Sequence, residues 1–169
     1  NFEIITVAGI TKIYGDTSIY GLGDSYYNYI TKTIDVETIA FADQSITLDT
    51  TLPAANIIWG TSEKETIIGT AGDDLIDSAG HDDTIDGGDG EDTLAIFSDK
   101  ANFEIITVAG ITKIYGDTEV SGLGNAYYGN TIRMINVETI VFADENVTLS
   151  TTLAADNIIW YDSFSGGKL

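Results

Sequence analysis

Three consecutive nine-residue units occupy residues 69–95, with the sequences GTAGDDLID, SAGHDDTID and GGDGEDTLA. The sixth residue of every unit is an aspartate, and the eighth is aliphatic. These residues are Asp74, Asp83, Asp92, Ile76, Ile85 and Leu94. A fixed period of this length, with glycine, aspartate and an aliphatic residue at set places, predicts a parallel β-roll (a β-solenoid) in which each unit supplies one turn and one short strand.

The turn of each unit has the chemistry of a calcium site. Glycine tolerates the positive φ angles that aim backbone carbonyl groups inward, and the aspartate at position six adds a carboxylate. Calcium binds about six to eight hard oxygen ligands of these two kinds. The aliphatic eighth residue is expected to point into the roll. Because successive turns fall on opposite sides of the roll, we expect a calcium ion between each turn and the next turn but one.

This stacking predicts the ligands. The turn at 69–74 is expected to lie over the turn at 87–92 and to form the strongest site. The turn at 78–83 is expected to lie between a degenerate unit at 60–65 and residues 96–101. In the strongest site the carboxylates of Asp74 and Asp92 are expected to bind the ion together with backbone carbonyls near Gly69, Ala71, Gly87 and Asp89. The other predicted ligands are Ser78, Gly80, Asp83 and Asp99.

The middle unit departs most from the repeat pattern. Ser78, Ala79 and His81 stand where glycines are expected, although Gly80 partly compensates. The middle turn is therefore predicted to be weaker than the other two. His81 is expected to be an exposed turn residue rather than a ligand or a base.

The units separate two copies of one longer sequence. Residues 1–17 recur letter for letter at 102–118, and 40 of the 59 residues in 1–59 are identical in 102–160. We therefore predict a β module at 1–59, the calcium-binding β-roll at 60–95, a second β module at 96–161 and a tail at 162–169 that derives partly from a cloning vector. The chain looks like a segment of a longer tandem array, and the modules are expected to cap the roll or to continue it as one elongated body.

Each module is predicted to be all-β. In the first copy, β-branched and aromatic residues predict strands at 2–7 and 10–14, with a tight turn at Ala8–Gly9. Two further strands are expected at 33–41 and 45–48, and a loop at 21–28. The only helix we expect is a short one at 50–56 and its equivalent at 151–157.

These units resemble the RTX (repeats-in-toxin, haemolysin-type) calcium-binding repeats of secreted bacterial proteins. The third unit matches the family pattern G-G-x-G-x-D-x-aliphatic-x at every defined position. The stretch from Asn136 to Asp144 also resembles the β segment that often follows such repeats. The resemblance implies type I secretion, a secreted or cell-surface location on a bacterium, and folding only in extracellular calcium.

Composition narrows the possible partners. The formal net charge is −20, from 27 acidic residues against 7 Lys and Arg. Such a surface disfavours nucleic acid and anionic membranes, which attract basic proteins, and favours cations such as calcium. No apolar stretch is long enough for a membrane span. With one histidine and no cysteine, we expect no enzyme.

Three functions are consistent with the sequence. The favoured one is a calcium-binding structural repeat, as in an adhesin, whose partners are calcium and neighbouring repeats of the same polypeptide. The first alternative is a calcium-dependent module that binds carbohydrate or a host surface through tyrosines. These are Tyr20, Tyr26, Tyr27, Tyr29, Tyr127 and Tyr128. The second alternative is a non-catalytic RTX region of a secreted hydrolase.

Overall fold

The computed structural model describes residues 2–15, 30–54, 56–116 and 129–151. In these ranges every regular element is a β-strand except one short 3-10 helix, η2 (Lys100–Asn102), which confirms the predicted all-β class. The strands are β1 (Phe2–Val7), β2 (Ile10–Gly15), β3 (Ile30–Thr33), β4 (Thr38–Ala40), β5 (Ser45–Thr47), β6 (Asn56–Trp59), β7 (Thr66–Ile68), β8 (Asp74–Asp77), β9 (Thr84–Asp86), β10 (Thr93–Ala95), β11 (Phe103–Val108), β12 (Ile111–Gly116), β13 (Thr131–Ile135), β14 (Thr139–Val141) and β15 (Asn146–Thr148).

The nine-residue units form a parallel β-roll, as predicted. The chain passes alternately between two sheets, so β6, β8 and β10 pair in parallel in one sheet while β7 and β9 pair in parallel in the other. Asn56 lies opposite Asp74, and Thr66 lies opposite Thr84. Each of these pairs is two units apart in the sequence, so every second turn is stacked.

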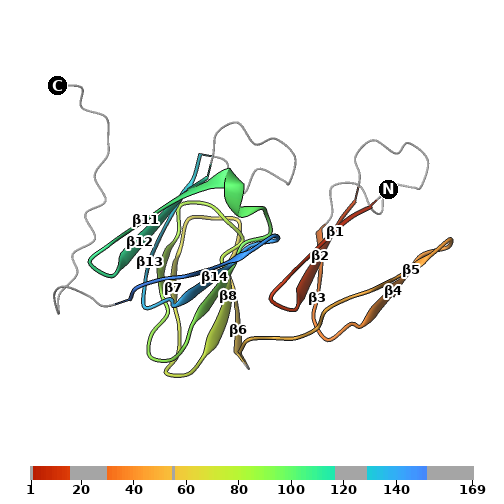
Figure 1. The fold of residues 1–169 in the computed structure, drawn as a ribbon, viewed down its shortest axis with the longest axis horizontal. Helices are drawn as coiled ribbons and strands as arrows, with labels where there is room; N and C mark the ends of the chain where they lie inside the picture. The colour runs from red at the N-terminus through yellow and green to blue at the C-terminus, as the bar shows by residue number, and fades with distance from the viewer. Residues whose placement is uncertain (1, 16–29, 55, 117–128, 152–169) are drawn as a thin grey trace.

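The second module continues both sheets of the roll. β13 pairs in parallel with β9, and β14 pairs in parallel with β10. The antiparallel hairpin β11–β12 then extends the first of these sheets through β12 and β13, and β15 extends the second. The result is two mixed five-stranded sheets that face each other (Figure 1).

The apolar core lies between the two sheets. The aliphatic residue at position eight of each unit points into it, as predicted, and none of Ile76, Ile85 and Leu94 is measurably exposed. The second module adds Met134 and Ile140 to the same cluster. Two segments far apart in the sequence therefore share one core.

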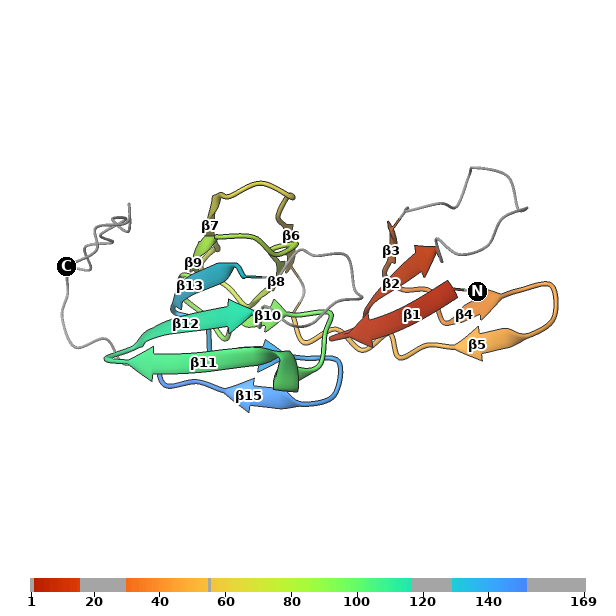
Figure 2. The same ribbon diagram turned by 90° about the horizontal axis from the view of Figure 1, so that it is seen from above.

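The first module lies against the outside of the roll. Its strands form an antiparallel sheet in the order β1–β2–β3 and a separate hairpin, β4–β5, which is the part farthest from the roll in Figures 1 and 2. A second apolar cluster joins Val7 and Ile10 of the hairpin β1–β2 to Leu75, Ala95 and Phe97 on the outer face of the roll. The turn at Ala8–Gly9 is present as predicted, with φ of 49° and 77°.

Two expectations about local structure are wrong. The strand expected at 33–41 is interrupted between β3 and β4, because Asp35 adopts a φ of 53°, outside the extended region. The stretch 50–54 contains no helix. The expected loop at 21–28 and nearly all of the expected helix at 151–157 lie outside the described residues.

Two isoleucines of the roll, one buried and one exposed, should differ sharply in their contribution to the free energy of unfolding. Replacing the fully buried Ile85 by alanine should lower the free energy of unfolding by about 2–5 kcal/mol, because a cavity opens between the sheets. The matched change at Ile68, which is 71% exposed, should alter it by less than about 0.5 kcal/mol. Urea unfolding in calcium measures both, and equal effects would contradict the assignment of the interior.

Candidate metal centre

Acidic residues from alternate turns are linked by hydrogen bonds into a row along one side of the roll, which we call a ladder. The backbone N–H of Asp74 donates to Oδ1 of Asp92 over 2.9 Å, and the N–H of Asp92 donates to Oε2 of Glu138 over 2.7 Å. Asn56 begins the ladder, because its side-chain amide donates to Asp74 Oδ1. The predicted stacking of the turn at 69–74 on the turn at 87–92 is therefore confirmed, and it extends into the second module.

A shorter ladder runs along the opposite side. The N–H of Glu65 donates to Oδ1 of Asp83 over 3.0 Å, so the turn at 78–83 stacks on the degenerate unit at 60–65 as predicted. On its other side Asp83 meets β13, whose Arg133 N–H donates to the Asp83 carbonyl over 2.9 Å. This ladder ends there.

The predicted position of residues 96–101 is wrong. The place next to β9 is filled by β13, which brings Ile132 and Met134 into the core. Asp99 instead lies exposed before η2, where the N–H of the next residue, Lys100, bonds to Asp144 Oδ1 over 2.8 Å. The structure therefore places Asp99 away from the two ladders.

Two carboxylates of the ladders have a free oxygen. Oδ2 of Asp83 and Oδ2 of Asp92 are buried and have no hydrogen-bond partner among the described residues. Both oxygens of Asp74, in contrast, accept hydrogen bonds from Thr70. A buried carboxylate oxygen without a partner is costly, and a calcium ion is a natural partner for it.

Backbone carbonyl oxygens lie close to the ladder carboxylates at position one of the first and third turns. A Cβ on Gly69 would overlap the carbonyl oxygen of Gly87 and approach Asp74 Oδ2. A Cβ on Gly87 would likewise overlap the carbonyl oxygen of Asn136 and Asp92 Oδ2. Only glycine leaves room for this approach. The two position-one glycines therefore each sit in a space lined by one carbonyl and one carboxylate oxygen.

The same arrangement recurs on the other side of the roll. Above Gly60 the space is lined by the carbonyl oxygen of Ser78 and Oε1 of Glu65. No cluster of three or more His, Cys, Asp or Glu side chains suited to a metal is found in the described ranges. The repeat pattern predicts that backbone carbonyl oxygens supply the remaining ligands.

The other predicted ligands surround these positions. Ala71 and Asp89 lie on the exposed tips of their turns, whereas Ser78 and Gly80 are buried in the middle turn. Which of the predicted residues bind calcium stays a prediction.

The middle turn keeps the repeat geometry at a conformational cost. Ala79 and His81 have φ of 62° and 73°, which confirms that they occupy positions suited to glycine. His81 is half-buried rather than exposed, and it lies beside Phe103 and Ile132. In the third unit the equivalent positions are Gly88 and Gly90, with φ of 99° and 123°. The predicted weakness of the middle turn therefore has a physical basis.

Three residues of the ladders were missed at the level of sequence: Asn56, Asn136 and Glu138. A signal for Glu138 was present, because Glu138-Thr139-Ile140 repeats the acid-Thr-aliphatic pattern of Asp83-Thr84-Ile85 and Asp92-Thr93-Leu94. The candidate tyrosines of the carbohydrate-binding alternative lie outside the described residues.

Stacked turns with paired carboxylates and inward carbonyls define a calcium-binding β-roll. Residues 59–94 match the family model described as RTX calcium-binding nonapeptide repeat, in four copies. The chain therefore contains RTX repeats, as the sequence indicated, and repeats of this family bind calcium ions. The match includes the degenerate unit that precedes Gly69. No curated protein matches the chain. Among the described residues no helix is long and apolar enough to cross a membrane.

Relief of backbone strain in the middle turn gives one prediction. Ala79→Gly should raise the free energy of unfolding by about 0.5–1 kcal/mol, because glycine adopts the positive φ without strain. Ala71→Gly is the matched control: Ala71 has no positive φ, so the change should destabilise by a similar amount through the greater freedom of the unfolded chain. Urea unfolding in calcium measures both. Destabilisation by Ala79→Gly would contradict the assigned backbone.

The free carboxylates predict how stability depends on pH without metal. Burial raises the pKa of Asp83 and of Asp92 to about 6. Between about pH 4 and pH 6 the folded state then holds protons that the unfolded state has released, so the stability of the metal-free protein should fall as pH rises through this window. In chelator, circular dichroism should show the folded fraction falling across this window. The double change Asp83→Asn/Asp92→Asn should flatten it, and an unchanged slope would contradict the assignment.

Proposed function

We propose that this chain is a non-catalytic structural repeat of an exported bacterial protein, in which extracellular calcium folds the RTX roll and thereby stiffens the modules on either side of it. The observation that supports this most directly is the pair of buried, unpartnered oxygens on Asp83 and Asp92. Both belong to turns that stack on their neighbours through the same carboxylates.

Electrostatic repulsion gives calcium its control over folding. Residues 69–92 contain nine acidic residues and no Lys or Arg. Bringing these carboxylates into stacked turns without a cation is opposed by their mutual repulsion. An ion that binds only the folded state adds its binding free energy to stability. The roll is therefore expected to be unfolded or loose without calcium and ordered with it.

The order of the roll is transmitted to both modules by direct contacts. β13 and β14 of the second module use β9 and β10 as their pairing templates. The first module is held by the apolar cluster around Val7 and by the ion pairs of Lys12 and Lys32 with Asp77. Loss of the roll removes the partners of both modules at once.

Folding that depends on calcium is also suited to export from the cell. A segment that stays unfolded at the low calcium concentration of a cytosol can be secreted as an extended chain, and it folds in the calcium outside. We therefore place the protein outside the cell or on its surface, with type I secretion as the route that RTX repeats imply. A repeat of this kind fits an adhesin or a similar long surface protein.

Calcium removal tests the proposal. In the wild type, calcium at about 100 times its dissociation constant should add about 3 kcal/mol of stability for one site, and chelator should remove it. Asp74→Asn/Asp92→Asn should abolish most of this gain. Calorimetry and circular dichroism measure stability, and amide hydrogen exchange of β13 and β14 reports whether the modules stiffen.

Asp89→Asn is the matched control. It removes one charge from the same block, but Asp89 is exposed and is predicted to contribute only its backbone carbonyl. This variant should keep the calcium response. A wild-type melting temperature that is the same in calcium and in chelator would show that the proposed function is wrong.

A further inference from the structure

The chain contains one hairpin twice, in two different environments. β1–β2 and β11–β12 have the same sequence and the same register, with Val7 opposite Ile10 and Val108 opposite Ile111. Their exposure nevertheless differs sharply: Val7 is 1% exposed, whereas Val108 is 66% exposed. Since the local sequence is identical, the difference comes from the surface that covers each hairpin.

The first hairpin shows which surface covers it. Its outer face packs on the outside of the roll, where Val7 and Ile10 join the cluster formed by Leu75, Ala95 and Phe97. Leu75 lies on β8, Ala95 ends β10 and Phe97 follows two residues later, and all three belong to this cluster rather than to the core between the sheets. The contact surface is thus an apolar strip on the outer face of an RTX roll.

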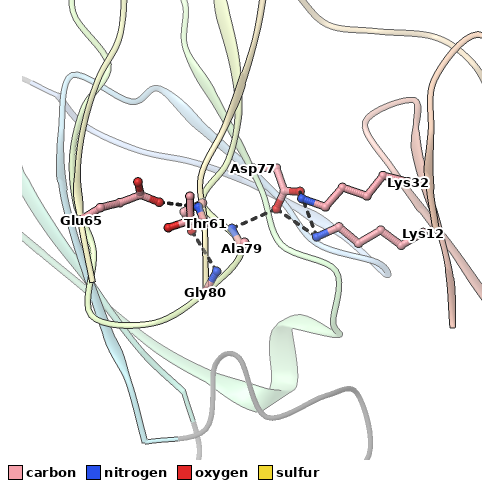
Figure 3. Close-up of polar contacts among 8 residues, drawn as sticks. Lys12, Lys32, Thr61, Glu65, Asp77, Ala79 and Gly80 are labelled. Atoms are coloured by element: carbon pink, nitrogen blue, oxygen red, sulfur yellow. Dashed lines mark hydrogen bonds and ion pairs between the residues drawn. The ribbon is translucent and has the colours of Figure 1, made fainter. Parts of the chain in front are cut away.

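A buried ion-pair cluster fixes this contact. Lys12 Nζ lies 3.0 Å from an oxygen of Asp77 and 3.7 Å from the centre of the Phe97 ring, and Lys32 Nζ lies 2.9 Å from Asp77. Figure 3 shows both lysines reaching from the first module to the one aspartate. Burial lowers the pKa of Lys12 and the charge of Asp77 opposes that effect, so the buried ammonium group depends on Asp77 as its partner.

The second hairpin, β11–β12, carries the same residues on its outer face, but there they are more exposed. Ile106 is 43% exposed, and Lys113, the equivalent of Lys12, is exposed. Arg133 stands where the first module has Lys32, so the positive charge is kept. The face formed by Ile106, Val108, Ile111 and Lys113 thus has the apolar residues and charges of a surface that is buried elsewhere in the same molecule.

We propose that this face of β11–β12 is the docking surface for the outer face of a further RTX roll, the one that follows the second module in a tandem polypeptide. An aspartate equivalent to Asp77 would lie between Lys113 and Arg133. The proposal rests on the proposed function as a tandem repeat. The sequence Asn-Ile-Ile-Trp that begins the roll at 56–59 recurs at 157–160, so a following roll would leave the second module at the same place.

A second copy of the chain is not the proposed occupant. The roll of each copy already has its outer strip covered by its own first hairpin, through Leu75 and Phe97. The docking surface therefore fits the next roll of one polypeptide, and the natural chain should remain monomeric through this face.

The test compares Val7→Ser with Val108→Ser in two proteins, the natural chain and the same chain extended after Trp160 by a further copy of residues 60–160. In the natural chain with calcium, Val7→Ser should lower the melting temperature by about 5 °C or more, and Val108→Ser should change it by less than about 1 °C. In the extended chain Val108→Ser should lower the melting temperature as much as Val7→Ser does. In the same extended chain, Lys113→Met should lower the melting temperature as much as Lys12→Met does.

The outcomes separate this inference from the proposed function. If the extended chain responds to calcium but Val108→Ser stays neutral, the docking surface is wrong and the function stands. If neither protein responds to calcium, the proposed function itself fails. A dimer of the natural chain that Val108→Ser dissociates would also overturn the inference, because the occupant would then be a second copy.

Discussion

The structure depends on the stacking of carboxylates from alternate turns. Three of these acids accept a hydrogen bond from a backbone N–H of a stacked turn: Asp83 from Glu65, Asp92 from Asp74, and Glu138 from Asp92. This arrangement aligns the strands, since the residue after each acid begins or continues a strand. It also concentrates negative charge along two lines, which only cations can neutralise. The same interaction therefore sets the register of the roll and makes its stability depend on metal.

The roll itself could be predicted because its signals are local. Nine-residue spacing fixes which turns stack, and the aliphatic eighth residues, such as Ile85, fix which side faces the core. The path of the chain beyond the roll could not be predicted in the same way. Residues 96–101 continue the nine-residue count, but β13 occupies the edge of β9 and places Ile132 and Met134 in the core. That choice depends on a segment tens of residues away.

Local backbone strain explains the other failed expectation. The composition of 33–41 favours one continuous strand, yet Asp35 and its counterpart Asn136 both adopt a φ near 50°. Asp and Asn tolerate this conformation better than most residues. In the second module the kink at Asn136 separates β13 from β14, so that one segment can serve both sheets of the roll. A position that looks like a defect in a strand is thus the turn that continues the roll.

The duplicated hairpin shows how far sequence alone can determine burial. Both copies fold alike, down to the hydrogen bond between Thr6 and Thr11 that recurs between Thr107 and Thr112. Only the first copy is followed in the structure by a roll that covers its outer face. A buried lysine such as Lys12 is stable only with a partner of opposite charge, so the hairpin is selective for a roll that presents an aspartate at the place of Asp77. The module therefore recognises the next roll by charge as well as by shape.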